Sequence, residues 1–256
     1  MTATLPPDLW QKSNWSMQLE RPSQPRRLHL ILAISQLVIW NIVGNEVMPA
    51  GWAPVFAIAG MAVLVAVARS GGVSWDYLGL DSSSLAQGIK IGLIGTGLVT
   101  AGVILAAALP TSRDFFADDR FVGVGTVEML YESLIRIPLG TALAEEVAFR
   151  GVLLGLLLMW LSPLRATLVS SALFGLWHIL PGLDSLETNP AGDIGGGWLA
   201  IVAGITVQVA GTALAGALFA WLRFRGRNLV APILVHWGLN AAAYAAGWLV
   251  VRNGWA

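Results

Sequence analysis

Long apolar runs separated by short polar segments dominate this chain from about residue 29 to its end. Most of these runs are close to the ~20 residues that a helix rising about 1.5 Å per residue needs to cross the hydrocarbon core of a bilayer. The runs lie at approximately 29–48, 52–68, 85–109, 127–160, 164–181, 197–222 and 228–251. This pattern predicts an all-α fold, a polytopic membrane helix bundle with about seven transmembrane helices.

The run at 127–160 is too long for one simple span, and its first half is charged. Glu128, Glu132 and Arg136 precede Pro138, which has no amide hydrogen for an ordinary helical hydrogen bond. We therefore expect an amphipathic or interfacial arm, then a kink, and then the true span.

Two pairs of glycines four residues apart lie within the apolar runs, at Gly88/Gly92 and Gly151/Gly155. Small residues at this spacing let transmembrane helices approach closely. We expect them to be packing positions, since no phosphate-binding glycine pattern occurs in the chain.

The composition agrees with residence in a membrane. Of the 256 residues, 56% are hydrophobic and 12% are charged, whereas soluble domains carry about 25% charged residues. The 15 basic and 15 acidic residues cancel, so no domain-wide positive field favours nucleic acid as a partner. Because the chain has no cysteine, disulfides, thiolate zinc sites and a cysteine nucleophile are excluded.

The chain divides into a tail and one bundle. Residues 1–27 are polar and rich in proline and lack the apolar region of a cleaved signal peptide, so we expect a cytosolic tail, flexible or lying on the surface. Residues 28–251 would form a single transmembrane bundle. The tail, the 69–84 loop and the basic cluster at 223–227 fall on one side, while the loop 182–196 carries acidic charges only. The positive-inside rule therefore predicts a multi-pass protein of the cell membrane with a cytosolic N-terminus.

Three short segments place polar side chains inside apolar runs, where ionisable groups are costly and tend to face a cavity or a partner. Each segment lies on a different predicted helix. They are Glu145-Glu146-Val147-Ala148-Phe149-Arg150-Gly151, Phe174-Gly175-Leu176-Trp177-His178 and His236-Trp237-Gly238-Leu239-Asn240. The remaining histidine, His29, lies at the edge of the first run and is expected to be interfacial.

Helical spacing distinguishes the two adjacent glutamates. Glu146 and Arg150 are four residues apart on one face and can pair, whereas Glu145 is rotated by about 100° and has no local cation. An unpaired carboxylate in an apolar cavity favours proton transfer near neutral pH. Glu145 is thus the better candidate for a base, and Glu146–Arg150 for a structural pair.

The same spacing puts Phe174 and His178 on one face, and His236 and Asn240 on another. If the helices converge, Glu145, the two imidazoles and the carboxamide could hydrolyse a bond with water, as base, orienting group and oxyanion donors. From spacing alone, a structural or translocation network explains these residues about equally well. Counted from the run ends, His178 and His236 lie near opposite ends of their helices, so they meet only if the helices are tilted, kinked or staggered.

The motifs of several other membrane hydrolases are missing. The sequence contains no HExxH of zinc proteases, no GxSxG serine elbow and no GxGD stretch of the intramembrane aspartyl type.

Together the three segments resemble a known family. Residues 145–151 look like its EExxxR motif, 174–178 like FxxxH and 236–240 like HxxxN. This is the CPBP family of intramembrane proteases, which includes the CAAX prenyl endopeptidases and bacteriocin-immunity proteins. The lead-in at 228–233 is also similar. The resemblance covers about 125–251, which would form the protease-like core, while the first hundred residues match only as generic spans.

The resemblance implies roles for the residues that line such a site. Glu145 would activate the attacking water, and His178 would help to position it. His236 and Asn240 would stabilise the oxyanion, and Phe174 would pack beside His178.

The resemblance also implies that Glu146 and Arg150 hold the site together. Family members are described both as metal-dependent and as glutamate proteases. The sequence favours the glutamate form, without a cofactor. A zinc ion bound by His178, His236 and Glu145 would leave the role of base vacant unless Glu146 took it.

The sequence therefore predicts an intramembrane endopeptidase that hydrolyses a peptide bond by a glutamate-activated water. Its partners would be the lipid bilayer and a membrane-associated peptide or protein substrate. The alternative is a non-catalytic membrane interaction or immunity protein that retains the family fold. A transporter is a weaker interpretation, because the polar groups cluster in one half of the chain without a repeated half.

Overall fold

The computed structural model describes residues 27–80, 82–188 and 197–255. Within these residues all regular secondary structure is helical, which confirms the predicted all-α bundle. Apart from Arg27, the expected cytosolic tail lies outside the described residues, and so does the second half of the 182–196 loop.

The elements fall into three groups. The long helices are α3 (Arg27–Glu46), α4 (Ala53–Ser70), α5 (Leu85–Ala108), α9 (Pro163–Trp177), α11 (Gly197–Gly226) and α12 (Val230–Arg252). The short helices between them are η1 (Ala50–Trp52), η2 (Ser82–Ser84), α6 (Pro110–Arg113), η3 (Asp114–Phe116), η4 (Asp119–Phe121) and α10 (Ile179–Thr188). A further helical path joins α7 (Thr126–Tyr131), η5 (Glu132–Leu143), η6 (Glu146–Leu153) and α8 (Leu154–Leu158).

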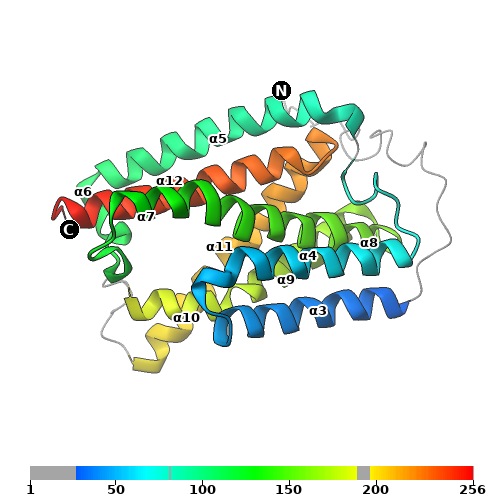
Figure 1. The fold of residues 1–256 in the computed structure, drawn as a ribbon, viewed down its shortest axis with the longest axis horizontal. Helices are drawn as coiled ribbons and strands as arrows, with labels where there is room; N and C mark the ends of the chain where they lie inside the picture. The colour runs from blue at the N-terminus through cyan, green and yellow to red at the C-terminus, as the bar shows by residue number, and fades with distance from the viewer. Residues whose placement is uncertain (1–26, 81, 189–196, 256) are drawn as a thin grey trace, which may run out of the picture.

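Six helical segments of the described residues are long and apolar enough to cross a membrane. They are Arg27–Glu46, Ala53–Ser70, Ser82–Ala108, Pro163–Leu186, Gly197–Gly226 and Val230–Arg252. The predicted count of seven is not confirmed, because the run at 127–160 is not among them. The path from α7 to α8 nevertheless runs along the bundle from one end to the other (Figure 1).

The path from α7 to α8 differs from the predicted arm followed by a kinked span. Helical structure continues through Pro138, which lies inside η5. Both η5 and η6 are π-helices, with hydrogen bonds between residues five apart. Because π-helices are rare and frequently occur at functional sites, this geometry marks the segment that carries Glu145 and Glu146.

The chain crosses the bundle back and forth, so its connections gather at two ends (Figure 1). One end holds the start of α3, the connection 71–84 and the turns at 159–162 and 227–229, and we call it the basic end. The other holds the connections 47–52 and 109–125 together with α10, and we call it the acidic end. The names refer to the excess of lysine and arginine at the first end and of aspartate and glutamate at the second.

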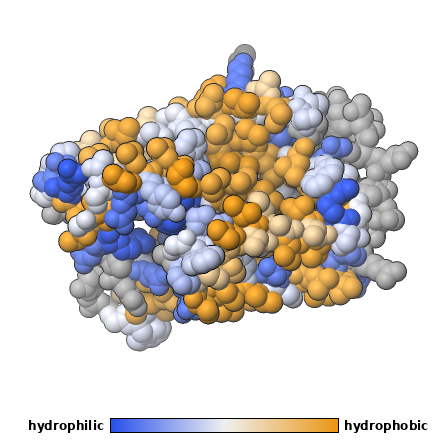
Figure 2. All heavy atoms as spheres, viewed as in Figure 1, coloured by the Kyte–Doolittle hydropathy of each residue, from blue (hydrophilic) through white to orange (hydrophobic). Residues whose placement is uncertain are grey.

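Large apolar side chains cover the outer faces of α5 and α11. In the isolated chain Leu93 is 59%, Leu98 71%, Val207 73% and Leu214 73% exposed. Figure 2 shows extensive apolar surface on one face of the molecule. A soluble monomer rarely exposes contiguous apolar patches of this extent, whereas lipid tails solvate them, so the protein is an integral membrane protein.

A connection between helices closes the basic end. The chain after α4 folds inward at residues 73–79, where Val73 and Leu78 are buried. The fully buried guanidinium of Arg223 donates to the carbonyl oxygens of Tyr77 and Arg150. We call residues 73–79, with Arg223 and the buried Leu229, the plug.

Helices α5 and α12 pack at a distance that only glycine allows. A Cβ atom at Gly88 would lie 2.1 Å from Oδ1 of Asn228, and one at Gly92 would lie 2.7 Å from Cδ1 of Leu234. The close helix packing predicted for this glycine pair is confirmed.

The pair Gly151/Gly155 has a different neighbour from the one predicted. A Cβ atom at Gly155 would lie 2.8 Å from the carbonyl oxygen of Tyr77, and one at Gly151 would lie 3.4 Å from that of Leu78. These glycines make room for the plug, so the prediction that a neighbouring helix packs against them is wrong.

Replacing Gly88 by alanine is expected to destabilise the fold by about 1–3 kcal/mol, the usual cost of overpacking. The added methyl group would displace the Asn228 carboxamide, which donates to the Ser84 carbonyl at 2.7 Å and accepts from the Val230 amide at 3.0 Å. Unfolding of the purified protein in detergent measures the change. Gly97→Ala on the same helix is the control, because a Cβ there meets nothing within 4 Å. Equal stability of the two variants would contradict the prediction.

Candidate active site

Three helical segments bring their polar side chains to one point inside the bundle. Glu145 lies between η5 and η6, His178 directly follows α9, and His236 lies in the second turn of α12. Oε2 of Glu145 is 3.9 Å from Nε2 of His178 and 4.0 Å from Nε2 of His236. The three side chains are 14%, 16% and 5% exposed, respectively, so they form a largely enclosed cluster.

His178 and His236 meet although the run ends place them near opposite ends of their helices. The reason is that α9 contains only 15 residues, about 22 Å at 1.5 Å per residue, after which the chain continues into α10. His178 therefore lies at the join of two helices inside one apolar run, and hydropathy alone does not reveal such a join.

Glu146 is fully buried and is bound by two partners. Its Oε1 accepts a hydrogen bond from Nη1 of Arg150 at 3.0 Å and lies 2.8 Å from Nδ1 of His236. An ionised carboxylate can only accept hydrogen bonds, so Nδ1 of His236 is the donor. In the neutral ring the lone pair then lies on Nε2, which faces Glu145.

His178 has the same tautomer for a different reason. Its Nδ1 lies 2.8 Å from the carbonyl oxygen of Phe174, and a carbonyl oxygen can only accept. The lone pair of the neutral ring therefore lies on Nε2, as in His236. The Phe174 ring packs edge-on against the imidazole, with the centroids 4.5 Å apart.

Aromatic rings surround the buried guanidinium of Arg150. Its Cζ lies 3.9 Å from the ring centroid of Phe174 and 5.1 Å from that of Phe219. Desolvated contacts of this kind contribute about 2 kcal/mol. Phe219 also stacks on His236, with centroids 4.8 Å apart, although it belongs to none of the three motifs. Because this contact joins α11 to α12, no spacing within one helix predicts it.

Arg223 is a second residue whose role the sequence pattern did not predict. It was expected to belong to a cytosolic basic cluster, but it is buried, whereas Arg225 and Arg227 are exposed. Its hydrogen bond to the Arg150 carbonyl holds the backbone of η6 against α11. One cationic side chain of that cluster therefore supports the site and does not contribute to the surface charge.

The first helix reaches the site through one hydrogen bond. Nδ2 of Asn41 on α3 donates to the carbonyl oxygen of Trp177 at 3.0 Å, directly before His178. Trp40 packs edge-on against Trp177, with centroids 5.7 Å apart. Helix α3 thus helps to position the end of α9.

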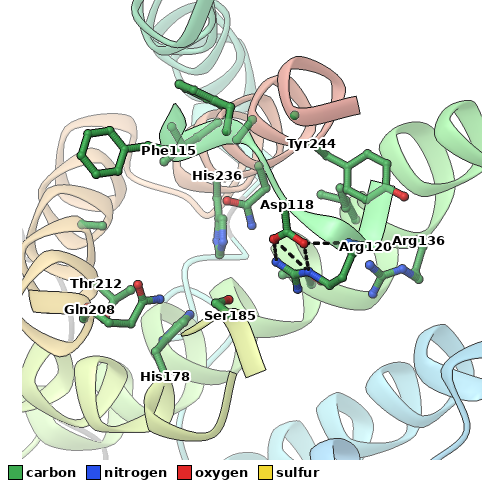
Figure 3. Close-up of a pocket in the computed structure, with 18 of the residues that line it drawn as sticks. Phe115, Asp118, Arg120, Arg136, His178, Ser185, Gln208, Thr212, His236 and Tyr244 are labelled. Atoms are coloured by element: carbon green, nitrogen blue, oxygen red, sulfur yellow. Dashed lines mark hydrogen bonds and ion pairs between the residues drawn. The ribbon is translucent and has the colours of Figure 1, made fainter. Parts of the chain in front are cut away.

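A cavity of about 610 Å³ leads away from the site. His178, His236 and Asn240 line it, together with Asp118 and Tyr244. Figure 3 shows the two imidazoles facing the same space from different helices. Asn240 lies one helical turn beyond His236, so its carboxamide borders the space that a substrate would enter.

Glu145, His178 and His236 are also the residues that could hold a metal ion. Oε2 of Glu145 is buried without a hydrogen-bond partner, and both imidazoles donate through Nδ1, as metal-bound histidines do. The donor chemistry therefore fits a cation. Ligand atoms around a tetrahedral zinc ion lie about 3.4 Å apart, whereas the separations here are 3.9 and 4.0 Å. At these separations no group of three or more His, Asp or Glu side chains in the described part of the chain forms a metal-binding set. The three residues therefore have suitable donor atoms for a metal ion, but they are not arranged around one.

Residues 128–242 match the family model described as "Type II CAAX prenyl endopeptidase Rce1-like". The matched segment contains all three motifs, at 145–151, 174–178 and 236–240. The family resemblance predicted from these motifs is therefore confirmed. No curated protein and no solved structure matches the chain.

Glu146→Gln is expected to destabilise the protein by about 3–5 kcal/mol, because loss of one partner of a buried ion pair leaves the other charge uncompensated. The side chains of Glu146 and Arg150 are 0% and 1% exposed. Unfolding in detergent measures the loss. Glu128→Gln, at an exposed position on α7, is the control and should leave stability unchanged. A greater loss for Glu145→Gln than for Glu146→Gln would contradict this assignment of the structural pair.

Proposed function

We propose that this membrane protein is an intramembrane endopeptidase, because residues 128–242 match the family model of the Rce1-like CAAX prenyl endopeptidases. It hydrolyses a peptide bond of a membrane-associated substrate with a water molecule that Glu145 activates. One observation carries the proposal: Oε2 of Glu145 and Nε2 of both histidines converge beside a cavity.

The nucleophile is a water molecule between Glu145 and His178. A water about 2.8 Å from both acceptor atoms fits their separation of 3.9 Å and can donate one hydrogen to each. Glu145 takes a proton as the water oxygen attacks the carbonyl carbon of the scissile bond. The C–N bond of the tetrahedral intermediate then breaks, and Glu145 returns the proton to the leaving amine. One water is consumed, and a carboxyl group and an amine are formed.

Asn240 and His236 stabilise the oxyanion of the intermediate. The Asn240 amide donates from the cavity wall, and such a donor contributes about 10²–10³-fold to the rate. His236 donates through Nε2 when that nitrogen carries a proton. The resulting imidazolium lies against the Glu146 carboxylate, which is 2.8 Å from Nδ1.

The surroundings of Glu146 support a glutamate mechanism over a metal-dependent one. A metal ion held by Glu145, His178 and His236 would polarise the scissile carbonyl, but it would also occupy Glu145. Glu146 is poorly placed to replace it as base, because its side chain is 0% exposed and forms an ion pair with the buried Arg150. The mechanism we propose therefore uses Glu145 as base and needs no metal.

We propose that the protein lies in the cell membrane with its N-terminus in the cytosol, as the positive-inside rule predicts. Its partners are the bilayer and a membrane-associated peptide or protein. This assignment is supported by the apolar outer surface of the helices that enclose the site.

Glu145→Gln is expected to lower the cleavage rate by about 10²–10⁴-fold, the usual contribution of a general base, while the protein still folds. The measurement compares the termini of membrane proteins in wild-type and variant cells, and then cleavage of an identified substrate by purified protein. Glu128→Gln is the matched control and should cleave at the wild-type rate. Full activity of Glu145→Gln would contradict the proposed mechanism. A variant that does not cleave but still restores the phenotype of a deletion strain would favour a binding function instead.

Strong chelators are expected to leave cleavage unchanged, because Glu145 activates water without a metal ion. Purified protein is treated with a chelator, dialysed against metal-free buffer and assayed, with the metal content measured in the same sample. Loss of activity that is restored by zinc alone would contradict the glutamate mechanism and assign Glu145, His178 and His236 as ligands.

A further inference from the structure

The cavity reaches only one end of the bundle. Its lining includes Phe115 and Phe121 from the connection between α5 and α7, Ser185 of α10, and Gly247 in the second half of α12. All of these elements belong to the acidic end (Figure 1). No described residue from the connection 71–84 or from the turns at the basic end lines the cavity.

The plug blocks the opposite direction. Between the site and the basic end, Leu153, Leu154 and Leu156 are fully buried. Behind them, Leu78 and Leu229 of the plug are 1% and 2% exposed. A peptide or a water molecule therefore reaches Glu145 from the acidic end.

The outer part of the cavity is polar, as a water-filled entrance requires. Asp118 forms a two-oxygen ion pair with Arg120, which is 55% exposed, and this hydrogen bonding raises the pKa of the Arg120 guanidinium. A second pair joins Arg136 to Glu132. Figure 2 shows hydrophilic residues around a hollow at this end, and Figure 3 shows both arginines at the cavity.

The two ends differ in charge. The basic end includes Arg27, Arg69, Lys90, Arg165, Arg225 and Arg227, against Asp76 among the described residues. The acidic end includes Glu46, Asp114, Asp118, Asp119 and Asp184, against Arg113, Arg120 and Arg252. Because Lys and Arg accumulate on the cytosolic side of a membrane, this distribution favours an orientation in which the basic end lies in the cytosol and the acidic end faces away from it.

From the closed basic end and the open acidic end, we propose that the active site receives its substrate from the extracytoplasmic face. The substrate class is then a polypeptide that presents its scissile bond on that face, either an exported peptide or the outer part of a membrane protein. That the incoming molecule is a substrate rests on the proposed function. The direction of access rests on the cavity, the plug and the charges alone.

The experiment uses single cysteines, because the chain has none of its own. Thr212→Cys and Ser185→Cys report on the cavity wall, while Ser70→Cys reports on an exposed position at the basic end. Sealed right-side-out and inside-out membrane vesicles are treated with a membrane-impermeant maleimide. After denaturation, the fraction of protein that carries the label is measured by mass spectrometry. The cysteine-free protein is the negative control.

We expect Thr212→Cys and Ser185→Cys to be labelled in right-side-out vesicles, and Ser70→Cys only in inside-out vesicles. Labelling of Thr212→Cys only in inside-out vesicles, or in neither preparation, would overturn the direction of access. Labelling of Ser70→Cys in right-side-out vesicles would overturn the assignment of the faces. Because labelling needs no catalysis, these results are independent of the cleavage assays, and a failure of the protease proposal is recognised separately.

Discussion

Glu146 and Arg150 form a buried pair of a carboxylate and a guanidinium. Such a pair constrains which side chains can pack around it. Neither lipid nor bulk water solvates these charges, so the protein must supply their environment. His236 from α12 binds the carboxylate, and the rings of Phe174 and Phe219 lie beside the guanidinium. The positions of α9, α11 and α12 around η6 follow from these contacts.

The reactive geometry is a consequence of the same environment. The hydrogen bond to Glu146 determines which nitrogen of His236 faces the cavity, and the Phe174 carbonyl does so for His178. Glu145, the residue directly before Glu146, accepts no hydrogen bond from a histidine or an arginine through Oε2. The two adjacent glutamates thus differ in their partners. Glu146 is bound through Oε1 by Arg150 and His236, whereas Oε2 of Glu145 faces the two imidazoles at 3.9 and 4.0 Å.

How far sequence reasoning succeeded depends on whether two partners share a helix. The pairing of Glu146 with Arg150, and of Phe174 with His178, follows from a spacing of four residues and could be predicted. Contacts between helices could not, because they depend on where each helix begins and ends. The stacking of Phe219 on His236 is of this kind. The π-helical turns of η5 and η6 were also missed, since hydropathy patterns assume an ordinary helical period.

Asn41, whose side chain donates to the Trp177 carbonyl, lies outside the segment that the family model describes, and so do Tyr77 and the rest of the 73–79 connection. The boundary of the recognisable protease segment is therefore not the boundary of the working unit. A change in α3 can move His178, and a change near Tyr77 can move the backbone of Arg150, without altering any motif residue. In proteins built this way, activity can be adjusted or lost at positions that a motif search does not inspect.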